Sequence, residues 1–254
     1  MVGDNTVDRY LDDGPVYIGG NALNVAVQLR LLGVPASYFG AVGDDAEGIR
    51  IAVALRDHGV HVAGLVTVKG ATAVTEIRLM PDGDRMFERE DFGVTASYTP
   101  SDAEVARIAK HDWVHIGMLP NAAVFVARLR ARNPGIRISQ DCAVSSGYAG
   151  LDVAFCSAGD DARAGQRMAG EALAGGAALA VVTRGAAGAT ASNGDRDWRC
   201  DAVSTQIVDT TGAGDSFIAG FIAARLDGAP VPAALSAGAQ TAASTCGHVG
   251  GFPQ

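Results

Sequence analysis

Helix-like and strand-like segments alternate between residues 101 and 183, and this alternation is the strongest constraint on the fold of the chain. Apolar residues at helical spacing predict helices at 101–110, 122–132 and 162–175. Short apolar and β-branched runs predict strands at 113–117, 136–141, 153–157 and 178–183. Strands that alternate with helices form a parallel sheet covered on both faces, and ligands bind at the carboxyl ends of its strands. The sequence therefore predicts an α/β fold around a mostly parallel sheet.

A further helix begins inside residues 209–221, DTTGAGDSFIAGF, where small residues stand next to an acid. Gly212, Ala213 and Gly214 run into Asp215, and apolar residues then recur at helical spacing. The first N–H groups of a helix have no internal partners, so small residues leave a backbone cradle for an anion such as a phosphate. Asp215 is either a helix-start carboxylate or the base that removes a proton from a hydroxyl group attacking that phosphate.

A pair of glycines also precedes a helix near the N-terminus. Gly19 and Gly20 let a polar ligand approach the backbone closely. Asn24 follows one turn into the helix, and its amide can both donate and accept hydrogen bonds. Taken alone, this segment is equally an ordinary glycine turn before a helix.

Together, DTTGAGDSFIAGF and GGNALNVA resemble the two signatures of the PfkB, or ribokinase-like, family of carbohydrate kinases. The resemblance spans nearly the whole chain and implies a single ribokinase-like domain over residues 1–254. In that family the amides matching Gly212, Ala213 and Gly214 form the anion hole for the transferred phosphoryl group. The acid matching Asp215 is the catalytic base.

The resemblance also implies which residues hold the sugar. Residues 1–10 match the family's first strand, although the stretch is short for a central strand. Its late acid is Asp8, which would contact sugar hydroxyls together with Gly19, Gly20 and Asn24. The alternative for Asp8 is a solvated turn carboxylate.

The nucleotide side is implied in the same way. Thr183, Gly185 and Gly188 resemble the family's Thr-x-Gly-x-x-Gly turn beside the ATP phosphates, where Thr211, Gly212 and Gly214 would also bind. Asp209 and Thr211 match positions that hold a monovalent cation in several relatives, so K⁺ is a candidate activator.

Magnesium is where the chain departs from the family pattern. Relatives carry Asn-x-x-Glu after the strand matched by residues 153–157, whereas this chain has CSAGDD at residues 156–161. Mg²⁺ is still expected to bridge the phosphates, and Asp160 or Asp161 is the candidate to hold it through water. Asp141 resembles the family's acidic residue near the reaction centre, and capping of a strand end is the alternative.

A hairpin interrupts the alternation of strands and helices. Residues 72–80 and 85–90 read as its strands around the turn at Pro81–Asp84. With residues 14–19, the segment 71–92 resembles the small β lid of the family, which shields the sugar and often mediates dimer contacts, so a homodimer through the lid is expected. Glu76, Arg78 and Glu88 either line the site from this lid or lie on a solvated face.

Composition excludes several classes of partner. The net charge is −8 and the basic residues are scattered, which argues against nucleic acid and against an anionic membrane. The four cysteines form no Cys-x-x-Cys pair, so a reducing compartment is expected. Without a signal peptide or a long apolar run, the expected location is cytoplasmic.

The implied reaction is ATP-dependent phosphorylation of a primary hydroxyl of a sugar derivative. GDNTVDRY, GGNALNVAV, the short lid and the missing Asn-x-x-Glu motif are together most similar to the fructoselysine 6-kinases, which phosphorylate O6 of fructosamines. One alternative is another sugar kinase, of fructokinase or ribokinase type, or a nucleoside kinase. A more distant alternative is a sugar or nucleotide sensor without catalytic activity.

Overall fold

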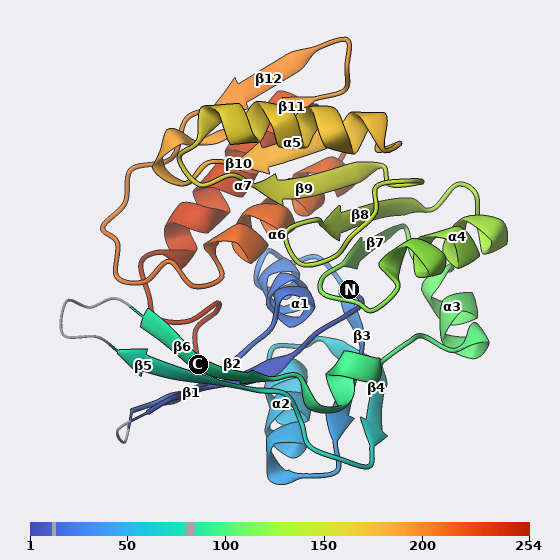
Figure 1. The fold of residues 1–254 in the computed structure, drawn as a ribbon, viewed down its shortest axis with the longest axis vertical. Helices are drawn as coiled ribbons and strands as arrows, with labels where there is room; N and C mark the ends of the chain where they lie inside the picture. Colours follow the sequence, from blue (N-terminus) through green and yellow to red (C-terminus); the bar gives the residue numbers. More distant parts are fainter. Residues whose placement is uncertain (12–13, 80–84) are drawn as a thin grey trace.

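The computed structural model describes residues 1–11, 14–79 and 85–254, and its main body is one long sheet (Figure 1). Six strands follow the order β12-β11-β10-β9-β8-β7, and parallel bridges from Val2 to Ile116 and to Phe39 join them to the pair β3-β4. These strands are β3 Ser37–Gly43, β4 His61–Val68, β7 Trp113–Ile116, β8 Arg137–Asp141, β9 Val153–Ser157, β10 Ala180–Thr183, β11 Ala189–Ser192 and β12 Asp197–Cys200. Only β11 and β12, at one edge, pair antiparallel. The predicted α/β fold with a mostly parallel sheet is confirmed.

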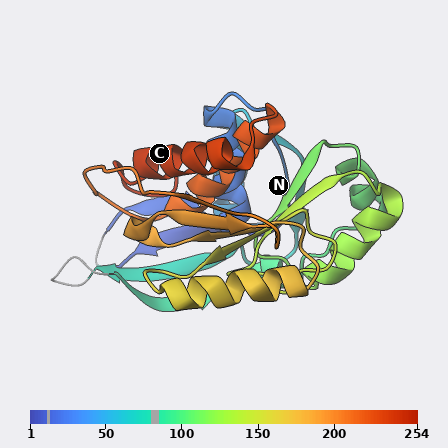
Figure 2. The same ribbon diagram turned by 90° about the horizontal axis from the view of Figure 1, so that it is seen from above.

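Helices cover both faces of this sheet (Figure 2). One face carries α1 Asn21–Leu31, α2 Ala46–Asp57, α6 Ala213–Leu226 and α7 Val231–Thr245. The other carries α3 Asp102–Ile108, α4 Ala122–Arg132 and α5 Ala162–Ala174. The 3₁₀ turns η1 Gly93–Ser97 and η2 Gly185–Ala187 lie in connections. Ser101 and Glu104 form a reciprocal capping box at the start of α3, as their spacing indicates.

A separate four-stranded sheet, in the order β2-β1-β5-β6, lies at one end of the main sheet (Figure 1). We call this sheet the lid. Its strands are β1 Thr6–Tyr10, β2 Val16–Gly19, β5 Val74–Leu79 and β6 Arg85–Asp91, so the segments 14–19 and 71–92 supply three of them.

The placement of β1 corrects the expectation that residues 1–10 form a strand of the central sheet. Only Val2 bridges that sheet. Gly3 then adopts φ +139°, and a Cβ there would lie 2.7 Å from the carbonyl oxygen of Met118. The chain turns at this glycine, which needs no side-chain room. From Thr6 it continues as a lid strand, parallel to β5 and antiparallel to β2.

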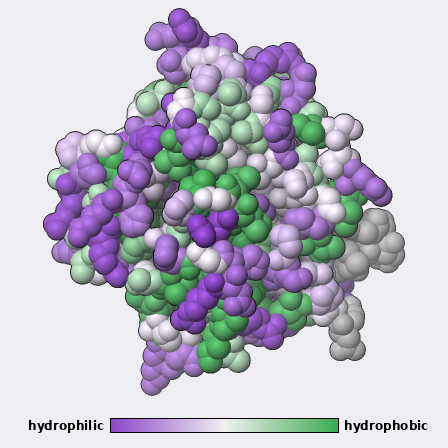
Figure 3. Space-filling view, turned by 180° about the vertical axis from the view of Figure 1, so that it is seen from behind, coloured by the Kyte–Doolittle hydropathy of each residue, from purple (hydrophilic) through white to green (hydrophobic). Residues whose placement is uncertain are grey.

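The face seen in Figure 3 mixes polar and apolar residues. Among the large apolar side chains that the structure describes, Ile49 and Ile207 are the most exposed, at 68% and 67% of full exposure, and they belong to different parts of the chain. Over the described ranges, no helix combines the length and the apolar character needed to cross a bilayer.

Candidate active site

Asp215 lies in the first turn of α6, and its buried carboxylate faces the start of α1. Asn24 donates an Nδ2–H hydrogen bond to Asp215 Oδ2 at 2.8 Å, and Asn21 Nδ2 donates to Asp215 Oδ1 at 3.3 Å. Phe217 and Phe221 of α6 share one hydrophobic cluster with Val25 of α1, which holds the two helices together. The two glycine-preceded helices, far apart in sequence, therefore meet at their N-termini.

The N-terminus of α6 is shaped to admit a ligand. Gly212 has φ +71°, and a Cβ there would lie 2.4 Å from the Cα of Gly251, so only glycine fits. A Cβ on Gly214 would meet no described heavy atom within 4 Å beyond its own helix backbone. The first N–H groups of the helix have no intrahelical acceptors and carry the positive end of the dipole. The N–H of Ala213 donates to the carbonyl oxygen of Thr210, ahead of the helix, at 3.2 Å. This turn thus has the properties of an anion cradle.

The N-terminus of α1 is filled by a side chain instead. The Asp4 carboxylate accepts hydrogen bonds from the backbone N–H groups of Asn21, Ala22 and Met118 at 2.6, 3.1 and 2.9 Å. Gly20 has φ +111°, and a Cβ there would lie 2.5 Å from the Cα of Asn5. The second glycine of the pair is therefore required for close packing of backbone against backbone.

Asp8 lies beside the first glycine of the pair. A Cβ on Gly19 would lie 2.8 Å from Asp8 Oδ2, so the absent side chain leaves room for this carboxylate. Asp8 is half-buried in β1 and belongs to the lid. The structure thus brings Asp8, Gly19 and Gly20 together, one helical turn from Asn24.

Three buried carboxylates gather around Asn21. Its Nδ2 donates to Asp141 Oδ2 at 3.4 Å as well as to Asp215, and its backbone N–H donates to Asp4. Burial raises the pKa of Asp215 well above its ordinary value of 3.8; the charges of Asp141 and Asp4 add to the effect, and the amide donors oppose it. Burial likewise raises the pKa of Asp141 to about 6. A carboxylate with a raised pKa holds a proton more tightly, as a general base must.

The turn after β10 packs closely at its last glycine. Gly188 has φ +83°, and a Cβ there would lie 2.2 Å from the carbonyl oxygen of Cys200. Gly185 also has positive φ, +50°, and its Cβ position lies 3.4 Å from Asp160 Oδ1. Asp161 caps α5 by accepting from the N–H groups of Arg163 and Ala164. Of the two candidates for magnesium, Asp160 is the one that lies at this turn.

Asp209 ties two loops together next to the cradle. Its Oδ1 accepts from the N–H of Thr211 at 2.8 Å and its Oδ2 from the N–H of Gly250 at 2.8 Å. Gln28 holds the same C-terminal loop from α1, because its Nε2 donates to the carbonyl oxygen of Gly251 at 2.7 Å. The predicted cation residues thus lie where the loop before α6 meets the loop after α7.

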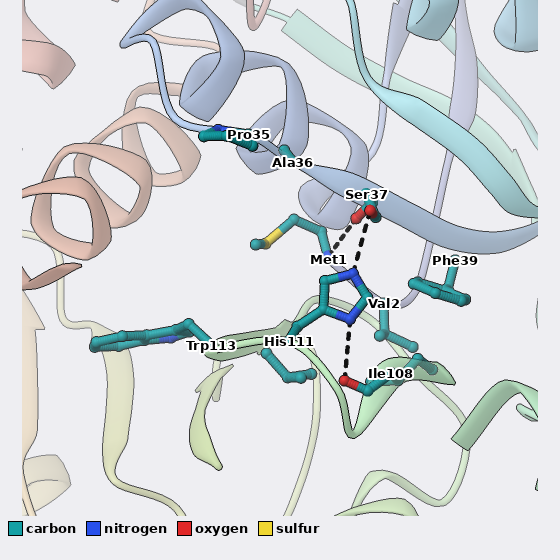
Figure 4. A pocket seen from close by; sticks show the side chains of 10 residues that line it. Met1, Val2, Pro35, Ala36, Ser37, Phe39, Ile108, His111 and Trp113 are labelled. Atoms are coloured by element: carbon teal, nitrogen blue, oxygen red, sulfur yellow. Dashed lines mark hydrogen bonds between the residues drawn. The ribbon is translucent and has the colours of Figure 1, made fainter. Parts of the chain in front are cut away.

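Two cavities lie elsewhere in the described part of the molecule. Figure 4 shows one of about 40 Å³, where the Met1 amino group donates to the carbonyl oxygen of Ser37 and His111 bonds Ser37 Oγ and the Ile108 carbonyl. The polar groups that line this cavity thus form hydrogen bonds with one another. A groove of about 540 Å³ runs between α5 and the strands β10 to β12, and no predicted site residue lines it.

Three residues at the site, Asn21, Asp4 and Gln28, were not among the site residues predicted from the sequence. Asn21 was recoverable, because it is the first helical residue after the glycine pair and carries a two-donor amide. Asp4 and Gln28 form hydrogen bonds with residues that are distant in the sequence. Asp4 accepts from the N–H of Met118, and Gln28 donates to the carbonyl oxygen of Gly251.

Comparison with known proteins adds independent findings. Residues 6–252 match the family described as pfkB family carbohydrate kinase. A fructosamine kinase of Bacillus subtilis (strain 168) is 35% identical over 269 residues, covering 99% of this chain and 91% of that protein. A fructoselysine 6-kinase of Escherichia coli (strain K12) is 32% identical over 256 residues, covering 99% and 98%. The structure of Arabidopsis thaliana ribokinase complexed with ribose and ATP matches with a TM-score of 0.88 at 21% identity, covering 100% of this chain and 94% of that one. The predicted ribokinase-like fold is confirmed.

Proposed function

Because the chain belongs to the pfkB family of carbohydrate kinases, we propose that it transfers the γ-phosphoryl group of ATP to O6 of a fructosamine such as fructoselysine. The enzyme class itself, a phosphotransferase with an alcohol acceptor, follows from family membership. The proposal concerns the identity of the acceptor. It is supported by relatives named fructosamine kinase and fructoselysine 6-kinase, which are 35% and 32% identical over nearly the whole chain.

One contact carries the assignment of the site, the 2.8 Å hydrogen bond from Asn24 to Asp215. It joins Asn24, which we expect to bind the sugar, to Asp215, which we expect to act as the base. A hydroxyl group held by Asn24 would therefore be within reach of Asp215, as general-base catalysis requires.

Each residue then has a defined task. Asp8, Gly19, Gly20 and Asn24 orient the acceptor, and Asp215 takes the proton of its hydroxyl group. Asn21 lies between Asp215 and Asp141 and donates to both carboxylates. The amides of Gly212, Ala213 and Gly214 stabilise negative charge that develops beside the helix terminus.

ATP and Mg²⁺ would bind at the start of α6 and at the turn after β10. The side of Gly214 that a Cβ would fill is free for a phosphate, and Thr183, Gly185, Gly188 and Thr211 would hold the nucleotide. Bound Mg²⁺·ATP supplies the phosphoryl group and the charge neutralisation. Asp160 is the better candidate to hold Mg²⁺ through water, and Asp209 with Thr211 would hold K⁺.

The lid is also the proposed contact of a homodimer. Val16 and Met86 are 37% and 41% exposed on the lid surface, and covering such side chains favours association. Analytical ultracentrifugation of the wild type and of Met86→Glu checks this. We expect a dimer that the charged variant dissociates, and a monomeric wild type would contradict the proposal.

The acceptor is tested with fructoselysine, fructose, ribose and adenosine in a coupled ATP assay, with ¹³C and ³¹P NMR of the product. We expect the highest kcat/KM with fructoselysine and a phosphate on O6. A higher kcat/KM with ribose or adenosine, or phosphate on another oxygen, would reject this acceptor. Absence of turnover with any sugar or nucleoside would favour a sensor.

A further inference from the structure

One face of the lid carries a row of polar and aromatic side chains that includes Asp8. In the strand register, Tyr17 of β2 lies opposite Asp8, Asp8 lies beside Thr75 of β5, and Thr75 lies opposite Glu90 of β6. Residues directly opposite one another on adjacent strands point to the same side of a sheet. The hydrogen-bond distance of 3.1 Å between Thr6 Oγ1 and Thr75 Oγ1 is consistent with this assignment. We call Tyr17, Asp8, Thr75 and Glu90 the acidic row.

The described arginines of the lid lie on one of its faces, together with several acids. On the face opposite the acidic row, Arg9 lies beside Glu76, and Glu76 lies opposite Arg89. Arg9 also pairs with Glu47 of α2 at 3.1 Å, which fixes that face toward α2. Among the lid side chains that the structure describes, the arginines thus point away from the acidic row. Glu90 is exposed and forms no ion pair with any described residue.

The acidic row faces the side of the lid where the catalytic residues lie. A Cβ on Gly250 would lie 3.6 Å from Cδ1 of Tyr17, which places this ring against the C-terminal loop. The same loop reaches Asp209 through Gly250 and packs Gly251 against Asn24. Tyr10 meets Tyr17 edge to face, with ring centroids 5.8 Å apart. A sugar held by Asp8 and Asn24 therefore has this row along its lid side.

We propose that the acidic row is a subsite for a cationic, amine-bearing arm of the acceptor, with the Glu90 carboxylate as its specificity determinant. The inference rests on the proposed function. An ammonium group is attracted by a carboxylate, whereas a neutral sugar carries no charge for Glu90 to attract. Strands lie about 4.8 Å apart, so Glu90, two strands from Asp8, lies roughly 10 Å from it, within reach of an alkylamine chain on a sugar held at Asp8. Tyr17 lies one strand from Asp8 on its other side.

The test compares Glu90→Gln with Glu76→Gln, a carboxamide substitution on the neighbouring strand but on the opposite face. For Glu90→Gln we expect KM for fructoselysine to rise roughly three- to ten-fold, with kcat nearly unchanged. KM for fructose stays at the wild-type value, and so do both KM values of Glu76→Gln. Added salt should raise the wild-type KM for fructoselysine and have less effect on Glu90→Gln.

Calorimetric titration with fructoselysine and with fructose, without ATP, separates this inference from the proposed function. Weaker binding of fructoselysine, with unchanged binding of fructose, in Glu90→Gln supports the subsite, even if fructoselysine is not the substrate that is turned over. Equal weakening for both sugars, or no weakening for either, overturns it. Unchanged melting temperatures establish that the variants are folded.

Discussion

At the scale of single residues, the Asp215 carboxylate is held by neutral amide donors and surrounded by other acids. Asn24 and Asn21 fix its two oxygens, whereas Asp141 and Asp4 contribute like charge. A cation in their place would lower the pKa and weaken the base. The local chemistry therefore combines a fixed direction with high proton affinity, which suits removal of a hydroxyl proton.

Replacing Asp215 by asparagine tests that role. An amide has nearly the same shape but cannot take a proton, so we expect kcat to fall about 10²- to 10⁴-fold while the acceptor still binds. Stopped assays and titration calorimetry measure the two quantities. The control is Asp227→Asn, which makes the same substitution at an exposed residue at the C-terminal end of α6. It should retain the wild-type kcat. A wild-type kcat in Asp215→Asn would show that Asp215 is not the catalytic base.

Asp141 gives a pH-dependent prediction of stability. Its pKa is raised by burial from 3.8 to about 6, so the folded state binds this proton more tightly than the unfolded state. Stability is therefore lost as pH rises from about 4 to about 6, at about 1.4 kcal/mol per pK unit. An asparagine side chain at this position has no charge to desolvate. We expect Asp141→Asn to be more stable than the wild type by roughly 2–3 kcal/mol at pH 7.5 and by little at pH 4.

Urea unfolding of both proteins at the two pH values measures this difference. The same pH dependence in wild type and Asp141→Asn would show that Asp141 titrates as an ordinary surface carboxyl group.

At the scale of elements, the two helix N-termini that meet at the site differ in what fills them. Asp4 occupies the start of α1, whereas the start of α6 is lined by glycine and alanine. Only the second can receive an external anion. Asp4 thus fills the start of α1, and the start of α6 is the one left open for the proposed phosphate.

Gly214→Ala separates stability from function in α6. Gly214 lies in the first turn, where alanine gains at most the roughly 0.5–1 kcal/mol over glycine that it gains in a helix interior, and its Cβ meets no described atom outside the helix backbone. The added methyl group, however, occupies the cradle. We expect a higher melting temperature together with a loss of kcat/KM for ATP of at least about ten-fold.

Gly170→Ala in α5 is the matched control, because its Cβ would also meet nothing within 4 Å. Gly170 lies in the interior of α5, so this variant should gain at least as much stability as Gly214→Ala and retain its kcat/KM for ATP. If Gly214→Ala retained it too, the anion cradle would have to lie elsewhere.

Elements with strong local signals could be predicted from the sequence. The helices at α3 to α6 and the strands β7 to β10 follow the periodicity of residues 101–226. The short edge strands β11 and β12 were not predicted, because four-residue strands on a polar hairpin carry little pattern. The path of β1 depends on the turn at Gly3 and on pairing with β5, a partner more than sixty residues away. Likewise, the Asp4 carboxylate accepts from the first N–H groups of α1 although it lies far from them in the sequence, so no local motif predicts this cap.

At the scale of the whole molecule, the C-terminal segment joins the lid to the main body. Its loop is held by Asp209 and Gln28 on the body side. Phe252 is fully buried and meets His58 edge to face. Gln254 then bonds β2 at the lid edge: its Nε2 donates to the carbonyl oxygen of Ile18 and its Oε1 accepts from the N–H of Ile18, both at 2.7 Å. The Ile18 backbone directly precedes the glycine pair, so this segment links the loop of Asp209 to Gly19 and Gly20.

Gln254→Ala removes both hydrogen bonds to Ile18 and leaves Phe252 in place. Each such bond contributes about 1 kcal/mol, so we expect faster hydrogen exchange of the Ile18 amide and a KM for the acceptor that rises roughly two- to five-fold. KM for ATP should change little, because the body contacts of the loop remain, and the melting temperature should fall by only a few degrees. Gln166→Ala on the exposed surface of α5 controls for loss of a glutamine side chain. An unchanged exchange rate at Ile18 would mean that the lid holds β2 without help from the C-terminal segment, and the acceptor side of the site would then be positioned by Gly20 and α1 alone.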